Sequence, residues 1–266
     1  MDDIFAGLEK FGMKKVAENV PQVFKAEQTK EVVKTEAVVK EFKIEDIIYE
    51  KSYVCQVCNF NFKSYAVRHG KTRITSIEFD LRPIYTPIEP LLYDVIICDG
   101  CGYTAVSESF NKINRRESDK ILKDITPHFV PVPYPKEPTI DEAIDRYKLA
   151  LLNCVVRESK EGERAYICMK ITWLYRIKGN EFINERKFAS LTLQGLNNAI
   201  EKESMPILGI SESAVLYLIS AFSTFLGDKT TALKVLSGLI TSKSTSNKLK
   251  NRARDLKETI MSMTVK

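Results

Sequence analysis

Two short stretches, Cys55-Gln56-Val57-Cys58 and Cys98-Asp99-Gly100-Cys101, decide how this chain folds. Two cysteines separated by two residues can direct both sulfurs at one ion from a single tight turn, here called a knuckle, and a second knuckle completes a tetrahedron. Asn59 and Gly102 follow the knuckles, and both residue types tolerate the positive φ that such a turn needs at this position. The spacing therefore predicts one Zn²⁺ site with the ligands Cys55, Cys58, Cys98 and Cys101.

The residues around the knuckles read as short strands, as in a zinc ribbon. Residues 53–54 and 60–62 predict a hairpin at the first knuckle, and residues 93–97 a strand that leads into the second. The 39 residues between Cys58 and Cys98 exceed the roughly 15 to 20 of a simple ribbon, and residues 73–81 alternate like a strand. We therefore expect a zinc-ribbon-like domain over residues 47–130 with an inserted sheet. After the second knuckle, this domain is expected to contain helices at 104–110 and 117–125.

The alternatives to zinc are a disulfide, unrelated buried thiols, a redox-active pair and iron. The start of the chain carries no signal-peptide pattern, so a cytoplasmic location is expected, where disulfides rarely persist. A redox pair of the thioredoxin kind belongs in a βαβ unit, which the pattern does not predict. Iron accepts the same four sulfurs and stays open as the alternative ion. Because sulfur fills all four positions, the metal is expected to be structural.

The rest of the chain divides into four further segments. Apolar residues at helical spacing predict a short amphipathic helix over residues 1–20, which docks either on a partner or on its own chain. Residues 21–46 read as a flexible tether, and the prolines of residues 131–138 as an extended linker. Residues 139–266 form an all-α domain with helices predicted at 139–158, 161–178, 181–203, 211–226, 229–241 and 247–262.

The predicted helices carry a loose internal repeat. Residues 218–239 resemble one helix–turn–helix unit of the tetratricopeptide kind, with Gly227 at the turn and Ala232 where the helices cross. The alanines Ala143, Ala189 and Ala232 are 46 and 43 residues apart rather than about 34, so the repeat is irregular. A non-repeating helical bundle is the alternative.

Charge and hydropathy limit the possible functions. No apolar run approaches the roughly 18 to 20 residues of a membrane span, so no membrane association is expected. The net charge of +5 equals that of residues 241–266, which hold seven Lys or Arg and two acidic residues. This basic tail, with basic residues near the knuckles, supports nucleic-acid binding as an alternative function; those residues are Arg68, Lys71, Arg73, Arg115 and Arg116.

Enzymatic motifs are scarce. The chain has only two histidines and no phosphate loop, dinucleotide fingerprint or serine elbow, so an enzyme is the least supported class and no catalytic residue is assigned. Arg82, within Asp80-Leu81-Arg82-Pro83, either clamps the nearby carboxylates of Glu89 and Asp94 or binds an anionic ligand.

The sequence also resembles a family. Tyr53-Val54-Cys55-Gln56-Val57-Cys58, Asp80-Leu81-Arg82-Pro83, Cys98 with Cys101-Gly102-Tyr103, and Asp141-Glu142-Ala143-Ile144 are similar to the bacterial proteins called domain of unknown function 2225. The resemblance covers residues 46–179 well and implies a cytoplasmic protein of clostridial or bacillar bacteria, with a cysteine-knuckle domain and tetratricopeptide-like helices. It implies no reaction. Gln56 stands where proline is usual in such proteins, which loosens the turn but removes no ligand.

Together these observations predict an α+β protein, with a small zinc-ribbon-like β domain followed by an all-α, tetratricopeptide-like domain. Its expected function is that of a zinc-binding scaffold whose helices at 139–266 recognise a protein or peptide.

Overall fold

The computed structural model describes residues 7–19 and 43–262, and within them strands come first and helices follow. The predicted α+β class is confirmed. Each strand pairs antiparallel with one neighbour, giving the three two-stranded sheets β1–β2, β3–β4 and β5–β6. The strands are β1 (Ile48–Val54), β2 (Asn61–Val67), β3 (Arg73–Ile77), β4 (Pro83–Thr86), β5 (Val95–Ile97) and β6 (Thr104–Val106).

Two of these hairpins carry the knuckles. β1 and β2 pair from Ile48 opposite Val67 to Val54 opposite Asn61, and the first knuckle forms their connection. β5 and β6 flank the second knuckle in the same way, and β3–β4 lies in the long gap between the two. The prediction of a helix at residues 104–110 is wrong, because residues 104–106 form β6. All three of its residues are buried and paired with β5, so a tertiary contact decides their conformation.

The helices match the predicted spans to within two residues. α3 begins after Thr139, whose hydroxyl accepts the Glu142 N–H at 3.2 Å while the Glu142 carboxylate accepts the Thr139 N–H at 2.7 Å. This capping box explains the sharp start of the helix. The helices are α2 (Arg115–Lys120), which continues in a π-helical turn (Ile121–Ile125), α3 (Ile140–Val156), α4 (Glu161–Lys178), α5 (Phe182–Lys202), α6 (Glu212–Leu226), α7 (Lys229–Thr241) and α8 (Asn247–Ser262).

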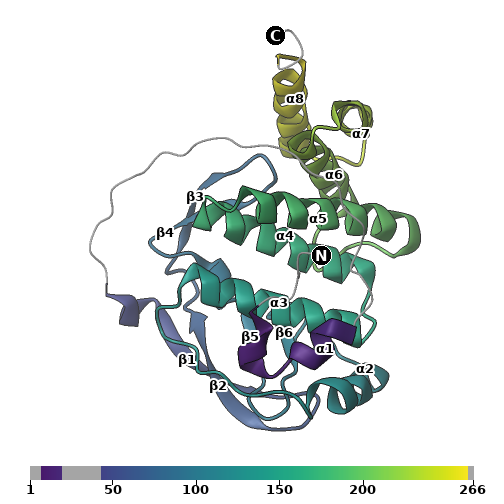
Figure 1. Cartoon of the computed structure of the whole chain (residues 1–266). Coiled ribbons are helices and arrows are strands. Elements are labelled where there is room, and N and C mark those ends of the chain that lie inside the picture. The colour runs from purple at the N-terminus through teal and green to yellow at the C-terminus, as the bar shows by residue number, and fades with distance from the viewer. Residues whose placement is uncertain (1–6, 20–42, 263–266) are drawn as a thin grey trace.

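The helices pack in sequence order, each on the next, from α3 to α8. α3 also lies against β5 and β6, and the side-chain amide oxygen of its buried Asn153 accepts the Thr104 N–H at 3.1 Å. The hairpin β1–β2 lies at one end of the molecule and α7 and α8 at the other (Figure 1). One cluster of buried residues extends from Leu8 through the knuckles to Phe222, so strands and helices share a core.

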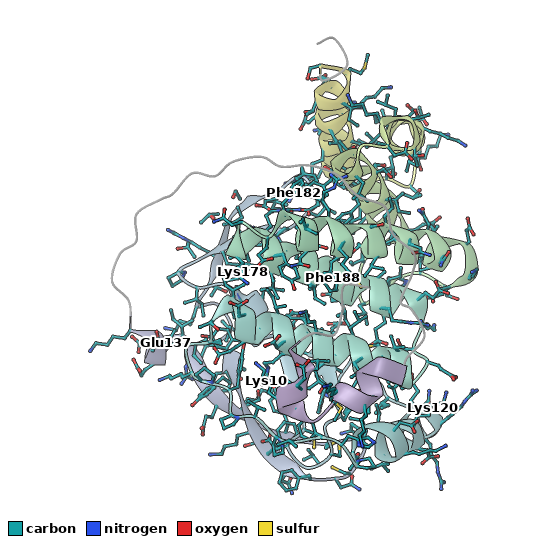
Figure 2. All side chains as sticks on the ribbon, viewed as in Figure 1. Lys10, Lys120, Glu137, Lys178, Phe182 and Phe188 are labelled. Carbon is teal, nitrogen blue, oxygen red and sulfur yellow. The ribbon has the colours of Figure 1, made fainter. Side chains whose placement is uncertain are left out.

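Two segments outside these elements pack on the same core. The first segment contains a 3-10 turn (Leu8–Phe11) followed by the short helix α1 (Lys14–Asn19). Three of its apolar side chains are buried: Leu8, Phe11 and Met13. Lys10 (labelled in Figure 2) forms a 2.6 Å ion pair with Asp145 of α3. This part of the predicted 1–20 helix therefore docks on its own chain. Most of the predicted tether lies outside the described residues; residues 44–46 form a 3-10 turn (Ile44–Asp46).

The proline-rich segment is bound to the strand-rich region by two tyrosine hydroxyls. Tyr134 donates to the carbonyl of Leu92 at 2.6 Å, and Tyr93 donates to the carbonyl of Lys136 at 2.9 Å. Across residues 7–19 and 43–262, none of the helices is both long and apolar enough to cross a membrane.

Candidate metal centre

The two knuckles have the same backbone structure. Asn59 and Gly102, the residues after the second cysteines, have φ values of 60° and 75°, as the sequence predicts. Equivalent hydrogen bonds close both turns. In the first, the Cys55 N–H donates to the carbonyl of Phe60 at 3.0 Å and the Asn59 N–H to that of Cys55 at 2.9 Å. In the second, the Cys98 N–H donates to the carbonyl of Tyr103 and the Gly102 N–H to that of Cys98, both at 2.9 Å. Two equivalent turns therefore present their cysteines to each other.

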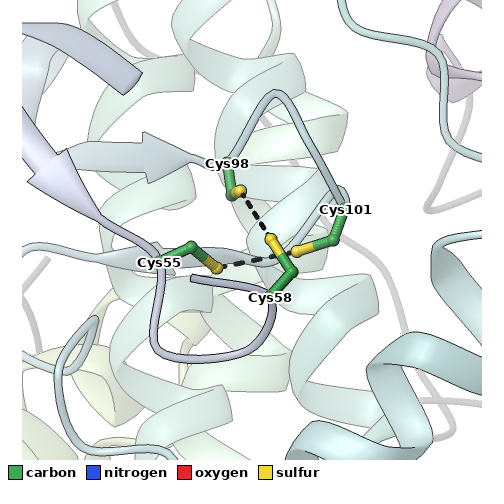
Figure 3. A group of neighbouring side chains, drawn as sticks. All are labelled: Cys55, Cys58, Cys98 and Cys101. Carbon is green, nitrogen blue, oxygen red and sulfur yellow. Dashed lines mark hydrogen bonds between the residues drawn. The ribbon is translucent and has the colours of Figure 1, made fainter. Parts of the chain in front are cut away.

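The four cysteine sulfurs form one compact cluster (Figure 3). All four Sγ atoms lie within 4.8 Å of one another. The closest pairs join the two knuckles, with Cys55 Sγ 3.6 Å from Cys101 Sγ and Cys58 Sγ 3.6 Å from Cys98 Sγ. A tetrahedron with metal–sulfur bonds of about 2.3 Å has sulfur–sulfur edges of about 3.8 Å. The cluster therefore has the size that one tetrahedral zinc or iron ion needs, whereas disulfide sulfurs lie about 2 Å apart.

Burial and mutual hydrogen bonding set the protonation of the cluster. Cys55, Cys98 and Cys101 are almost fully buried and Cys58 partly so. Hydrogen bonds from the Cys101 and Cys98 thiols lower the pKa of Cys55 to about 2, while the contacts with Cys55 and Cys98 raise the pKa of Cys101. One sulfur thus gives up its proton readily and its neighbours resist a second negative charge. A bound cation removes that repulsion, because it attracts every thiolate in the cluster.

Side chains from later in the chain hold the second knuckle in place. A Cβ added to Gly102 would lie 2.5 Å from Cγ of Phe129, so this ring packs directly on the backbone of the knuckle. The Thr126 hydroxyl donates to the carbonyl of Cys101 at 2.9 Å. Gly100 is covered in the same way by the ring of Phe60. The knuckles are thus packed against each other and against the segment after the π-helical turn.

The other sulfur-bearing candidates are separate from this cluster. Cys154 and Cys168 are fully buried on α3 and α4, and burial raises the pKa of the Cys154 thiol to about 12. They act as small core side chains.

Arg82 forms a carboxylate clamp rather than an open anion site. Its guanidinium pairs with Glu78 at 3.0 Å and with Glu89 at 3.2 Å. Glu89 was an expected partner, whereas Glu78 takes the place expected for Asp94.

A second ionic contact near Arg82 has no signal in the sequence. The fully buried carboxylate of Asp80 accepts the indole N–H of Trp173 at 3.0 Å and pairs with Arg176 at 2.9 Å. Asp80 and Trp173 are 93 residues apart, so local patterns do not indicate their contact. It ties the inserted sheet to α4.

Two of the basic residues considered for nucleic-acid binding make contacts within the chain. Arg116 pairs with Glu158 at 3.3 Å, and the Arg68 guanidinium lies over the ring of Tyr49. The basic helix α8 lies at the opposite end of the molecule from the β1–β2 hairpin (Figure 1). The structure thus separates the basic helix α8 from the β1–β2 hairpin, where Arg68 contacts Tyr49.

Comparison with known proteins identifies the family. Residues 48–260 match the family described as uncharacterised proteins conserved in bacteria, domain of unknown function 2225. No curated protein and no solved structure gives a match. The matched residues begin at β1 and end in α8, so they include both knuckles and all helices from α2 onward. The chain therefore belongs to the bacterial family of domain of unknown function 2225.

Proposed function

We propose that this chain is a zinc-binding interaction protein of the bacterial cytoplasm, in which the metal fixes the strand-rich region and the helices bind a protein or peptide. The observation that carries the metal assignment is the four-sulfur cluster, whose cross-knuckle distances of 3.6 Å fit one tetrahedral ion. A reducing compartment suits such a site, because it keeps the thiols available for the metal.

Zinc in this site would be structural. Cys55, Cys58, Cys98 and Cys101 would fill its four positions. Bound zinc would supply folding free energy by joining two hairpins through ligands such as Cys58 and Cys98, which are 40 residues apart in sequence. Two-stranded hairpins are marginal by themselves, so a cross-link between them has a large effect.

The order of helix packing supports a recognition surface on the helices. Successive contacts from α3 to α8, with α8 also touching α6, are typical of helical solenoids, which present an extended surface to peptides and proteins. Gly227 has a φ of 99° in the turn between α6 and α7, and the buried Ala221 and Ala232 pack in the core that these helices share with α8. These features favour the tetratricopeptide-like unit read from the sequence.

The metal assignment is tested by elemental analysis of the purified full-length chain. We expect about one zinc per chain in the wild type and loss of that zinc in Cys98→Ser. Cys168→Ser is the matched control, since it removes an equally buried thiol outside the cluster and should keep the metal. Iron in place of zinc, or a metal content unaffected by Cys98→Ser, would overturn the assignment.

Partner recognition is tested with an exposed apolar side chain of the helices. Ile183 at the start of α5 is 75% exposed, and we expect Ile183→Glu to abolish capture of a protein that the wild-type chain reproducibly enriches from native lysate. Leu122→Glu, at a 41% exposed position outside the α3–α8 series, should leave capture intact. Equal loss in both variants, or no reproducible protein in the wild type, would contradict the role of the helices.

A further inference from the structure

A cavity of about 380 Å³ lies where the β1–β2 hairpin, the β3–β4 insertion and α4 meet. Five aromatic side chains contribute to its lining: Tyr49, Tyr53, Tyr85, Tyr93 and Trp173. Its volume falls in the range of small-molecule sites, which are also commonly lined by aromatic residues with a few polar groups. The cavity shares no lining residue with the metal centre.

Lys170 is the unusual polar group in this lining. Its Nζ lies 4.9 Å from the ring centre of Tyr166 and 4.8 Å from that of Trp173. Within the described residues, it has no ion pair and no hydrogen bond. Burial lowers the pKa of Lys170, while the nearby carboxylates of Asp94 and Glu89 act in the opposite direction without forming an ion pair with it.

The other charged residues of the cavity are already engaged. Arg82 pairs with Glu78 and Glu89. Lys51 differs from Lys170 in exposure, because Lys51 is an exposed residue whose charge water solvates, with its Nζ 5.1 Å from the ring centre of Tyr53. The carboxylate of Asp94 accepts hydrogen bonds from Ser107 and from the Tyr147 hydroxyl. Lys170 is therefore the cation whose charge is left for a ligand.

The combination of groups selects the class of ligand. An aromatic cavity with carboxylates on its wall suits a cation in principle. The lining holds three cations (Lys51, Arg82 and Lys170) and two carboxylates (Glu89 and Asp94). Glu89 pairs with Arg82 and Asp94 accepts two hydroxyl hydrogen bonds, so Lys170 is the partly buried charged group of the lining that has no hydrogen bond or ion pair among the described residues. A cationic ligand would be repelled by Lys170, whereas an anion would gain a charge-assisted hydrogen bond from it.

We propose that this cavity binds a small anionic molecule that carries a flat unsaturated ring, with the anionic group at Lys170 and the ring against the tyrosines and Trp173. The phosphate of a nucleotide and the carboxylate of an aromatic acid offer the same chemistry to Lys170. A mononucleotide and an aromatic carboxylate are therefore the two probes that distinguish these sources.

The sole tryptophan of the chain reports on binding, because Trp173 lines the cavity. The full-length protein is titrated with adenosine monophosphate and with nicotinate, and Trp173 fluorescence and calorimetric heat are recorded. The uncharged probes adenosine and nicotinamide, and inorganic phosphate alone, test the ring and the charge separately. We expect saturable binding of at least one charged ring probe, and binding at least about tenfold weaker for its uncharged partner and for phosphate.

Lys170→Met should weaken binding of that probe by about tenfold or more, since it removes the charge but keeps an unbranched side chain that is one atom shorter. Its melting temperature should equal or exceed that of the wild type, because a desolvated charge is lost. Lys234→Met, on the exposed face of α7, is the matched control and should bind as the wild type does. No binding of either charged ring probe at about 1 mM, or equal affinity in Lys170→Met, would overturn the proposal.

Discussion

The strand-rich region and the helices are stabilised in different ways. No residue of β3 is buried, and β1 is mostly exposed apart from Ile48. In α3, by contrast, every residue from Tyr147 to Cys154 is buried. The hairpins β1–β2 and β3–β4 thus bury little apolar surface, while α3 to α6 share one continuous core and α7 and α8 share a second one with α6.

It follows that the strand-rich region depends on a small number of specific contacts. These are the four sulfurs, the contact of Asp80 with Trp173 and Arg176, and the packing of Phe129 on the second knuckle. A helix that buries many side chains can lose one contact at small cost, whereas a hairpin held by one cluster cannot. Perturbations of equal chemical size should therefore have unequal effects in the two regions.

Metal removal should have the largest effect and should separate the regions. Chelation of zinc removes the cross-link between the two knuckles, and we expect the melting temperature to fall by about 10 °C or more. Amide hydrogen exchange, followed by mass spectrometry, should rise strongly in residues 48–67 and little in α4 and α5.

Added zinc should restore the protection, and Cys98→Ser should show the exposed pattern without chelator. Equal loss of protection in α4 and α5 would contradict the expected difference between the two regions, because it would show that they unfold as one unit.

A pair of glycine substitutions should have the next largest effect. Gly70 and Gly102 have φ values of 74° and 75°, so Ala at either position costs about 1–2 kcal/mol in backbone strain. Nothing lies within 4 Å of a Cβ at Gly70, whereas Phe129 lies 2.5 Å from one at Gly102, which adds about 1–3 kcal/mol from overpacking. Urea unfolding at fixed zinc should therefore show a larger loss for Gly102→Ala than for Gly70→Ala.

The double variant Gly102→Ala with Phe129→Ala checks the origin of that difference. Without the ring, Gly102→Ala should lower the free energy of unfolding by about as much as Gly70→Ala does. The loss in the double variant is taken relative to the single variant Phe129→Ala. Equal losses in the two single variants would mean that the knuckle adapts to the added methyl group.

The sequence predicts well those features whose cause is local. The start of α3 follows from Thr139 and Glu142, three residues apart, and the end of α6 from Gly227. The backbone conformation of each knuckle also has a local cause. Asn59 and Gly102 directly follow the second cysteines, and both residue types tolerate the positive φ that the turn needs there. Cysteine spacing then indicates the cluster, because few other arrangements satisfy two such turns.

Features that depend on distant residues could not be predicted in this way. Residues 104–106 carry no clear strand period and become β6 only because β5 and α3 bury them. The buried carboxylate of Asp80 and the isolated ammonium of Lys170 have meaning only once α4 lies beside the inserted sheet. Trp173 is buried in the core, yet it also lines the cavity.

The smallest effect is expected for a helix cap in the helical region. Asp228 caps α7 by accepting the Thr231 N–H at 3.0 Å, and Asp228→Ala should cost about 1 kcal/mol in urea unfolding at pH 7. The hydrogen bond with Thr231 lowers the pKa of Asp228 below its unfolded value. The stabilisation is therefore complete above about pH 4, the unfolded pKa, and is lost as the pH falls through the folded pKa.

The difference in unfolding free energy between wild type and Asp228→Ala should accordingly shrink on acidification below about pH 4. Acid also protonates the cysteine ligands, but equally in both proteins, so the difference isolates the cap. Asp228→Asn keeps a neutral cap, and its advantage over alanine should not change with pH. A loss at pH 7 as large as that of Gly102→Ala would contradict the view that the shared core of the helices tolerates the loss of a single contact.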